Sequence, residues 1–396
     1  MAMLVLLTLW GLYLFVGQLD ATQLRLANEQ RGAAALAEAR DSLVSDAISR
    51  ASLDTSTYYA AGFLVLPDLG SPFEGGAPSE GLVPTLNHTG NSIDRTVIGK
   101  FPWKTLAYPP VRDSRGECLW YVVSGRFKIA PKTHVALNWD TRGQIDVLDG
   151  GGNVVASDVA ALIAAPGRAL DGQSRALADA AYGDCGGNYD ARNYLDSFNG
   201  ADAVAGQVNY FVGSTNNRAA PDANNKSFIM AQSDHYNDRF LFITVDDIFD
   251  PLIRRSDFAA AIAGLLDDPG FQSHLQTIAI TGSKGTGNLL CSQAPDPVFC
   301  ENWKEMLLLT QLPTASPIVI DRIASAASCS RVLIFGGRKT TAQSRATAID
   351  KANKDNYLEN QNAASFGVPM ATATNFSGAS AFDFRTPTSD LVRCLP

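Results

Sequence analysis

The chain has 396 residues, and 32 Lys and Arg against 40 Asp and Glu give it a formal net charge of −8 at pH 7. This balance argues against nonspecific nucleic-acid binding by the whole surface. A hydrophobic content of 46% with 18% charged residues excludes a disordered chain, and the length suffices for an N-terminal helix plus one large or two ordinary domains.

The chain begins with an uncharged apolar run, Met1 to Val16. As a helix this run spans ~24 Å, a little less than the ~30 Å hydrocarbon core of a bilayer. Residues 17 to 52 contain no proline, and their apolar side chains fall on one helical face with charged residues between them. We therefore expect one helix of about 50 residues, apolar at its start and amphipathic afterwards.

The first residues also bear on processing. No Lys or Arg precedes Arg25, and no A-x-A cleavage site follows the apolar run, so a cleavable secretory signal is not indicated. The sequence is expected to begin as a mature protein does. The apolar run and its amphipathic continuation to about Ser52 together resemble the N-termini of type IV pilins and pseudopilins.

The resemblance implies how the N-terminus is used. In this family a prepilin peptidase removes a short basic leader, and the new first residue, here Met1, is methylated. The apolar half-helix then holds the subunit in the bacterial inner membrane until it packs into a filament core. The residues that the resemblance assigns to the membrane and the filament core are Met1, Leu4, Val5, Leu6, Leu7, Leu9, Trp10, Leu12, Tyr13, Leu14, Phe15 and Val16.

One position departs from the family pattern. Shaft pilins usually carry a glutamate at the fifth mature position, where its carboxylate offsets the terminal amine of a neighbouring subunit. This chain has Val5, and its first acid is Asp20. The lack of that glutamate is typical of the tip pseudopilin of type II secretion systems and of some minor pilins. The alternative interpretation of the N-terminus is an ordinary single-pass anchor.

Short strands and turns follow the helix. Residues 60 to 70 predict a strand, residues 71 to 91 a surface loop, and CLWYVVSGRF within residues 98 to 128 a second strand. Residues 101 to 124 are similar to a segment that recurs in large proteins with pilin-like N-termini. The aromatic residues of this segment are expected to pack between helix and sheet: Trp103, Trp120 and Tyr121. Two apolar runs in residues 144 to 165, with a glycine turn in the first, predict a hairpin.

The chain then repeats itself. Residues 162 to 176, LIAAPGRALDGQSRA, align without gaps on residues 332 to 346, VLIFGGRKTTAQSRA. Further on, NYLD at 193 to 196 matches NYLE at 356 to 359. A period of about 165 to 170 residues is too long for a solenoid unit and indicates a duplicated module.

Each copy of the repeat carries two arginines. They are Arg168 and Arg175 in the first copy and Arg338 and Arg345 in the second. These guanidinium groups could bind an anionic ligand, or each could tie a long loop to the carboxylate of its own module, Asp196 or Glu359. We favour the structural role, because a shared fold requires the same spacing in both copies.

The modules are expected to meet after residues 227 to 270, which predict a strand, RFLFITV, and a helix that begins at Pro251 and closes at Pro269. The expected domains are 1–55 for the helix, 56–270 for the first module and 271–396 for the second. In the second module, residues 301 to 311 predict a short helix. TGSKGTG at 281 to 287 predicts a glycine turn, because it lacks the Lys-Ser/Thr ending of a P-loop.

Six cysteines beyond an anchor suggest an oxidising compartment and up to three disulfides. Cys291 and Cys300 are close in sequence with prolines between them, which suits a local disulfide loop. The other pairs are open among the fifteen connectivities that six cysteines allow, and we expect Cys118 with Cys185 and Cys329 with Cys394.

No arrangement of residues indicates catalysis. The four histidines do not pair at metal-ligand spacing, and no GxSxG motif is present. An acidic cluster that includes Asp246, Asp247 and Asp250 is a weak calcium candidate, with solvated side chains at strand ends as the alternative. We expect no enzymatic activity, no other metal and no cofactor.

These observations combine into one expected fold and function. The fold class is α+β, with a long N-terminal hydrophobic and amphipathic helix followed by a globular head of two related antiparallel-sheet modules. The function is that of a structural subunit of a type IV pilus-like or type II secretion pseudopilus filament, with the head exposed for adhesion. The alternative is an inner-membrane-anchored periplasmic enzyme or ligand-binding protein.

The expected partners follow from the family resemblance. They are the same or other pilins in a helical filament, the prepilin peptidase and the assembly machinery, and the inner membrane before assembly; nucleic acid is not expected. The chain would lie in the bacterial inner membrane first and then in a periplasmic or extracellular filament.

Overall fold

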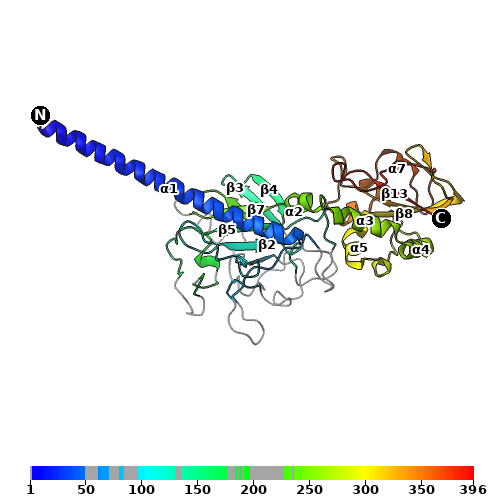
Figure 1. Cartoon of the computed structure of the whole chain (residues 1–396), viewed down its shortest axis with the longest axis horizontal. Coiled ribbons are helices and arrows are strands. Elements are labelled where there is room, and N and C mark those ends of the chain that lie inside the picture. The colour runs from blue at the N-terminus through cyan, green and yellow to red at the C-terminus, as the bar shows by residue number, and fades with distance from the viewer. Residues whose placement is uncertain are drawn as a thin grey trace. The chain divides into compact units, whose positions relative to one another are not determined.

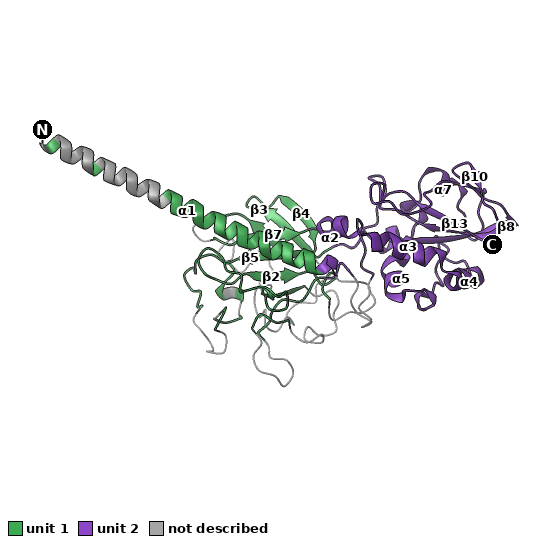
Figure 2. Ribbon diagram, in the orientation of Figure 1, with its two compact units in different colours: residues 1–46, 64–131, 143–243 green, residues 47–63, 132–142, 244–396 purple. Residues whose placement is uncertain are grey.

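The computed structural model describes residues 2–49, 61–70, 80–83, 96–129, 136–175, 183–185, 187–189, 191–196, 226–233 and 236–396. The chain divides into two compact units (Figure 2). Unit 1 comprises residues 1–46, 64–131 and 143–243, and unit 2 comprises residues 47–63, 132–142 and 244–396. Each unit is described by itself below.

Helix α1 (Ala2–Ser49) has 48 residues and begins unit 1 (Figure 1). Its sequence contains no proline, so nothing interrupts its backbone hydrogen bonds. Towards its C-terminal end, Gly32, Leu36, Ala39 and Leu43 are buried. Their spacing of three and four residues places them on one face of the helix. The amphipathic half of the expected helix is therefore present and packs through that face.

The expected membrane-spanning character of this helix is wrong. In the part of the chain that the structure describes, no helix is both long enough and apolar enough to cross a bilayer. The reason is the length of the apolar run. It stops at Val16, after which charged residues such as Arg25, Glu29 and Arg31 follow, whereas a crossing helix needs about 20 consecutive apolar residues.

Unit 1 is built on a four-stranded antiparallel sheet in the order β1-β2-β5-β7. The strands are β1 (Val97–Lys100), β2 (Trp120–Val123), β5 (Ala161–Ala165) and β7 (Arg239–Ile243). A second sheet has the order β4-β3-β6, in which β3 and β6 run parallel. Its strands are β3 (Ile145–Asp149), β4 (Val154–Val159) and β6 (Lys226–Met230). Of the two apolar runs predicted to form a hairpin over residues 144 to 165, the first forms the hairpin of β3 and β4. The second is β5, which pairs with β2 and β7 in the other sheet.

The core of unit 1 lies between these two sheets. Trp120 and Leu162 of the first sheet pack in one cluster with Val147 and Phe228 of the second. Side chains alternate along a strand, so the neighbours of these residues, such as Tyr121, face the other side of the first sheet. That side is also buried, and α1 lies along the sheet (Figure 1), with the Arg40 Nε donating to the backbone oxygen of Phe242 at 3.4 Å.

The aromatic residues of the resembling segment occupy the interior of unit 1. The side chains of Trp103, Trp120 and Tyr121 are 7%, 0% and 0% exposed. The Tyr121 hydroxyl donates to the backbone oxygen of Val65 at 3.1 Å. Their predicted role in packing therefore agrees with the structure. Residue 60 of the predicted strand, and residues 71 to 79 and 84 to 91 of the predicted surface loop, lie outside the described residues.

Unit 2 contains a three-stranded antiparallel sheet in the order β13-β11-β8. Its strands are β8 (Leu307–Ser316), β11 (Cys329–Phe335) and β13 (Leu391–Leu395). A small mixed sheet, β10-β9-β12, adds β9 (Val319–Ile320), β10 (Ile323–Ala324) and β12 (Asn375–Phe376). The helices of unit 2 are α2 (Val245–Leu252), α3 (Ser256–Asp267), α4 (Pro269–Thr277), α5 (Pro297–Trp303), α6 (Ala348–Ala352) and α7 (Asn360–Ser365).

Aromatic side chains fill the core of unit 2. Trp139 and Trp303 meet edge to face with ring centroids 4.7 Å apart. Phe258 of α3 lies 5.0 Å from Trp303, and Phe335 of β11 lies 6.3 Å from Trp139. Because aromatic pairs of this geometry add about 0.5–1.5 kcal/mol to simple burial, this cluster fixes α3 and α5 against the sheet.

Two boundaries differ from the sequence prediction. The predicted boundary near residue 270 lies instead between Ile243 and Thr244, because α2 and α3 pack in unit 2. Helix α2 starts at Val245, ahead of Pro251, since Thr244 and Asp247 form a capping box there. Helix α3 ends at Asp267, just before Pro269, as predicted. Pro269 then begins a further helix, α4, where the Asp268 carboxylate caps the Phe271 amide at 2.7 Å.

The described fold also corrects two other sequence predictions. The class is α+β, but each unit carries a mixed sheet beside its antiparallel one, so the modules are not purely antiparallel. The helix predicted over residues 301 to 311 ends early: α5 and a 3₁₀ turn (Lys304–Met306) stop at Met306, and the apolar run after it is β8. A run of leucines is compatible with either structure, and pairing with β11 decides for a strand.

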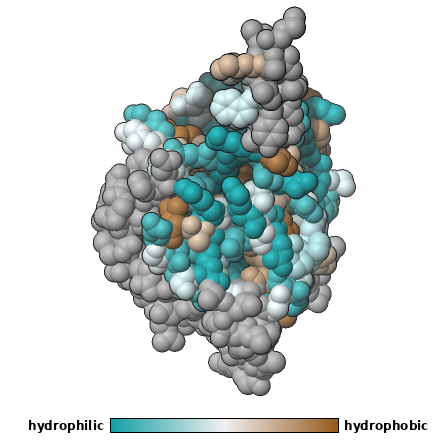
Figure 3. All heavy atoms as spheres, turned by 90° about the vertical axis from the view of Figure 1, so that its left-hand side faces the viewer, coloured by the Kyte–Doolittle hydropathy of each residue, from teal (hydrophilic) through white to brown (hydrophobic). Residues whose placement is uncertain are grey.

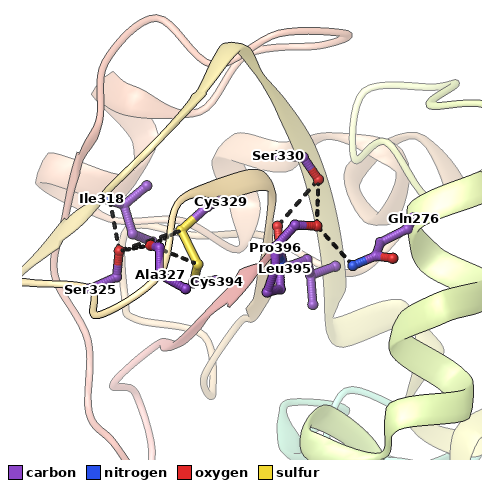
Figure 4. Close-up of a disulfide and its surroundings, with 9 residues drawn as sticks. All are labelled: Gln276, Ile318, Ser325, Ala327, Cys329, Ser330, Cys394, Leu395 and Pro396. Carbon is purple, nitrogen blue, oxygen red and sulfur yellow. Dashed lines mark hydrogen bonds between the residues drawn. A yellow bond between two sulfur atoms is a disulfide. The ribbon is translucent and has the colours of Figure 1, made fainter.

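All six cysteines are paired. The disulfides are Cys118–Cys185 in unit 1 and Cys291–Cys300 and Cys329–Cys394 in unit 2, the same three pairs that the sequence predicts. Cys329 and Cys394 join β11 to β13 near the C-terminus, where Ser330 Oγ and Gln276 Nε2 donate to the Pro396 oxygen (Figure 4).

The lengths of the two disulfide loops of unit 2 generate a prediction. The paired cysteines are 65 and 9 residues apart in sequence. A disulfide lowers the conformational entropy of the unfolded chain, and this effect grows with the length of the loop that it closes. Replacing Cys329 and Cys394 by serine should therefore lower the free energy of unfolding by ~4 kcal/mol, and replacing Cys291 and Cys300 should lower it by ~2.5 kcal/mol. Urea unfolding of the full chain, followed by tryptophan fluorescence, measures both. Equal losses, or a larger loss from the short loop, would contradict this explanation.

Candidate functional site

The N-terminal part of α1 is the first candidate site. Residues 22 to 26 are exposed on every side of the helix, and among the α1 side chains that the structure describes, partial burial begins at residue 27. Several large apolar side chains on this exposed part are therefore in water: Met3, Trp10, Leu24 and Leu26, at 78%, 65%, 66% and 53% exposure. Met3 and Trp10 are seven residues apart, which places them on the same face of the helix.

The predicted filament-core residues fall on this part of α1. The backbone of residues 4 to 16 is helical. Among the predicted core residues only Trp10 has a described side chain, and Met1, the predicted methylation site, lies outside the described residues. Trp10 is exposed rather than packed on unit 1, so it is available to another molecule.

The duplicated segment forms the second candidate site. In both units its loop follows an inner strand of the antiparallel sheet, β5 or β11, and begins at a glycine turn. Gly167 and Gly337 have no room for a side chain, because a Cβ at either position would overlap the residue just ahead of the last strand, Asn237 or backbone atoms at Thr388. The identical glycines of the repeat thus have the same packing reason.

The hydrogen bonds of the two copies also match. Gln173 Nε2 donates to Asp196 at 3.0 Å, and Gln343 Nε2 donates to Glu359 at 2.9 Å. The Oε1 atom of each glutamine accepts a hydrogen bond from the backbone amide of the residue three positions earlier, at 3.0 and 2.9 Å. The next residue in each copy donates its amide to an asparagine side chain, Asn193 or Asn356.

One arginine in each copy holds this loop together. Arg175 Nε donates to the Asn193 carbonyl at 2.8 Å and its Nη1 to the Gly167 carbonyl at 2.8 Å. Arg345 makes the same two bonds, with Nε to Asn356 at 2.6 Å and Nη2 to Gly337 at 3.0 Å. The predicted loop-tying role is present for these two arginines, although they bind backbone carbonyls, and glutamine rather than arginine contacts the carboxylate.

Each loop arginine also lies against a buried tyrosine. The Arg175 guanidinium is 5.1 Å from the Tyr194 ring centroid, and that of Arg345 is 4.0 Å from Tyr357. A lysine ammonium lies near each of the same rings, Lys100 at 5.3 Å and Lys284 at 4.1 Å. Burial lowers the pKa of both lysines to about 8. Lys284 belongs to the glycine turn at residues 281 to 287, so this turn places its ammonium group beside the Tyr357 ring.

The arginines differ in their acidic partners. Arg345 Nη1 forms an ion pair with Asp140 at 2.8 Å, and the two side chains are 0% and 1% exposed. Arg175 lies 3.5 Å from the carboxylate of Glu117, which is 30% exposed. Neither acid lies in the repeated segment, so the repeat alone did not reveal them. The signal was absent from the sequence, because Asp140 and Arg345 are 205 residues apart.

The other two arginines of the repeat have separate roles. Arg338 pairs with Asp250 at 2.6 Å and also with Asp246, which are two of the three calcium candidates. The third, Asp247, caps α2. Among the described residues no group of three or more His, Cys, Asp or Glu side chains is arranged to hold a metal. Arg168 is exposed and borders a cleft in unit 1.

A pair of carboxyl groups recurs beside each loop. In unit 2, burial and then the charge of Glu359 raise the pKa of Asp390 to about 7. In unit 1, burial and then Asp196 raise the pKa of Asp238 well above its usual range. Asp238 and Asp390 each directly precede the last strand of their sheet. In unit 2 the pair lines a polar cleft of about 550 Å³, so this site is open to solvent there.

Comparison of the chain with protein-family models, with curated proteins and with solved structures finds no match. The two copies of the repeated segment, one in each unit, can still be compared with each other.

Removal of the Arg345 side chain tests the loop interaction. Arg345→Met leaves the buried Asp140 carboxylate without its partner, so we expect a loss of ~3–5 kcal/mol in the free energy of unfolding. Arg338→Met is the matched control and should cost at most ~1 kcal/mol, because its acidic partners are 69% and 46% exposed. Changing Asp140 to Asn in the Arg345→Met chain should restore part of the loss. Equal losses for the two arginines, by urea unfolding, would refute this view.

The carboxyl pair of unit 2 makes stability depend on pH. With a pKa of about 7 in the folded state, Asp390 keeps its proton where the unfolded chain has lost it, so stability should fall as pH rises from about 4 to 7. Glu359→Gln removes the neighbouring charge but keeps the acceptor for Gln343. This variant should be more stable than wild type by ~1 kcal/mol at pH 8 and equal to it near pH 4. Thermal unfolding across this range checks it; a pH-independent difference would count against the pair.

Proposed function

We propose that this chain is a structural subunit of a pilus-like filament, in which α1 packs against the α1 helices of neighbouring subunits. The observation that carries the proposal is the division of α1 into two parts. Its C-terminal part has a buried apolar face on unit 1, whereas its N-terminal part holds Met3, Trp10, Leu24 and Leu26 in water. Large apolar side chains exposed together on one helix favour association with another copy.

Such packing would contribute a large part of the free energy of assembly. Burying one large apolar side chain contributes ~1.5–3 kcal/mol, so four of them on each helix outweigh much of the cost of ordering a subunit. The resemblance of residues 1 to 16 to the pilin N-terminus supports the same assignment. The partners would be copies of this chain or other pilins in the filament. The prepilin peptidase and a pilus or pseudopilus assembly system would act on the chain before and during assembly.

The proposed location is outside the bacterial cytoplasm, in the periplasm or in an extracellular filament. All six cysteines are in disulfides, and disulfides persist in oxidising compartments. In such a filament the β-sheet units would form the outer surface and make contact with other surfaces.

A single charge on the exposed part of α1 tests the proposal. Trp10→Glu would place a carboxylate in the packed bundle, so we expect the concentration needed for assembly to rise at least tenfold. Ala33→Glu adds the same charge at an exposed position farther along α1 and should assemble like wild type. Light scattering and electron microscopy of the purified chain measure assembly. A wild-type chain that stays monomeric with or without other pilins, or a Trp10→Glu chain that assembles normally, would overturn the proposal.

A further inference from the structure

A cleft of about 770 Å³ opens in unit 1 beside α1. The described residues that border it come from residues 24 to 32 of α1, the turn at 113 to 115, the turn at 165 to 168, and residues 232, 233, 236, 237 and 239. The view from the N-terminal end of α1 shows a mostly hydrophilic surface on this side of the molecule (Figure 3). The cleft is large enough for a small oligomeric ligand, since ligand sites span about 300–1,000 Å³.

The borders of the cleft are fixed to one another. Asp113 accepts the Gly167 amide at 2.9 Å through Oδ2 and the Arg115 amide at 2.8 Å through Oδ1, so its carboxylate joins the two turns. The Glu29 carboxylate of α1 lies 3.3 Å from Arg239 and 3.2 Å from Arg25. The site is therefore formed within unit 1 without a ligand.

The described lining of the cleft has an excess of positive charge. Among the described residues that line it, four are arginines, namely Arg25, Arg115, Arg168 and Arg239, and two are acids, Glu29 and Asp113. Both acids are engaged by the contacts just described. In a protein of net charge −8, an excess of guanidinium groups in one concavity raises the local concentration of anions.

The remaining lining narrows the class of anion. Amide and hydroxyl groups come from Asn28, Gln232, Ser233 and Asn237, and such groups both donate to and accept from sugar hydroxyls. The aromatic residue of the lining, Tyr236, is only 3% exposed, and its hydroxyl donates to the Ile229 carbonyl at 2.8 Å. Stacking of nucleic-acid bases needs an exposed aromatic face, which the described lining does not offer.

We infer that this cleft binds an acidic oligosaccharide. Its carboxylates pair with the guanidinium groups of Arg115 and Arg168, since the planar fork of arginine matches the geometry of a carboxylate. Its hydroxyls contact the amides of Asn28, Gln232 and Asn237. The inference gives the surface of unit 1 a ligand class and concerns that unit alone, so it does not depend on assembly of the chain into a filament.

Titration calorimetry of the full chain with tetragalacturonate tests the inference. We expect binding that weakens as salt is raised, because exposed charge pairs are screened. The Arg115→Gln, Arg168→Gln double variant should raise the Kd at least tenfold. The matched control, Arg322→Gln with Arg385→Gln, changes two exposed arginines of unit 2 and should leave the Kd unchanged.

The competing ligands are probed in the same way. Maltotetraose, which lacks carboxylates, and a thymidine tetranucleotide should both bind at least tenfold more weakly than tetragalacturonate. Absence of tetragalacturonate binding, an equal effect of the control variant, or equal or tighter binding of either competitor would overturn the inference. Repeating the titration with Trp10→Glu separates this test from that of the proposed function, because unit 1 keeps its cleft whether or not the chain assembles.

Discussion

The rest of each unit depends on the hydrogen bonds of one buried arginine, Arg175 in unit 1 and Arg345 in unit 2. Arg175 and Arg345 each hold a glycine turn and an Asn-Tyr-Leu segment together by donating to carbonyls on both. A guanidinium group is suited to this position because its five donors lie in one plane and it keeps its charge. The ring of Tyr194 or Tyr357 covers its face. These contacts hold the loop that follows β5 or β11 in each unit.

The two units share this arrangement but have diverged around it. In unit 1, the mixed sheet and α1 cover the two faces of the antiparallel sheet. In unit 2, helices and an aromatic cluster around Trp139 and Trp303 supply the core. The arginine of unit 2 has gained a fully buried partner, Asp140. Loss of one partner of a buried ion pair leaves an uncompensated buried charge, and here the pair joins the segment around Asp140 to the repeated loop.

The features that distinguish unit 1 are at its surface. Helix α1 holds exposed apolar side chains at its N-terminal part, and the arginine-lined cleft lies beside the part of α1 that packs on the sheet. The first feature is suited to association between subunits, and the second is suited to a small anionic ligand. They use separate residues, apart from Leu24, which belongs to both, so the structure allows one function to change without the other.

The sequence by itself determined the features that depend on local pattern or on internal identity. The helical spacing of Leu36, Leu43 and Ala47 predicted a long helix with one apolar face. The apolar runs and glycine turn of residues 144 to 165 predicted a hairpin, of which the first run forms β3 and β4. The repeat identified two related modules, and its identical glycine and arginine positions indicated a shared structural role. The prediction of a membrane-spanning helix was wrong for the part of the chain that the structure describes, where no helix is both long enough and apolar enough to cross a bilayer.

Only the tertiary structure decided the features that join residues distant in sequence. The partner of Arg345 is 205 residues away at Asp140, the acids at Asp246 and Asp250 pair with Arg338 rather than forming a metal site, and the cleft collects four separate segments. The leucine run at β8 became a strand through its pairing with β11. In each case the deciding energy comes from burial and pairing between segments, and local sequence preference carries no information about which distant segment supplies the partner.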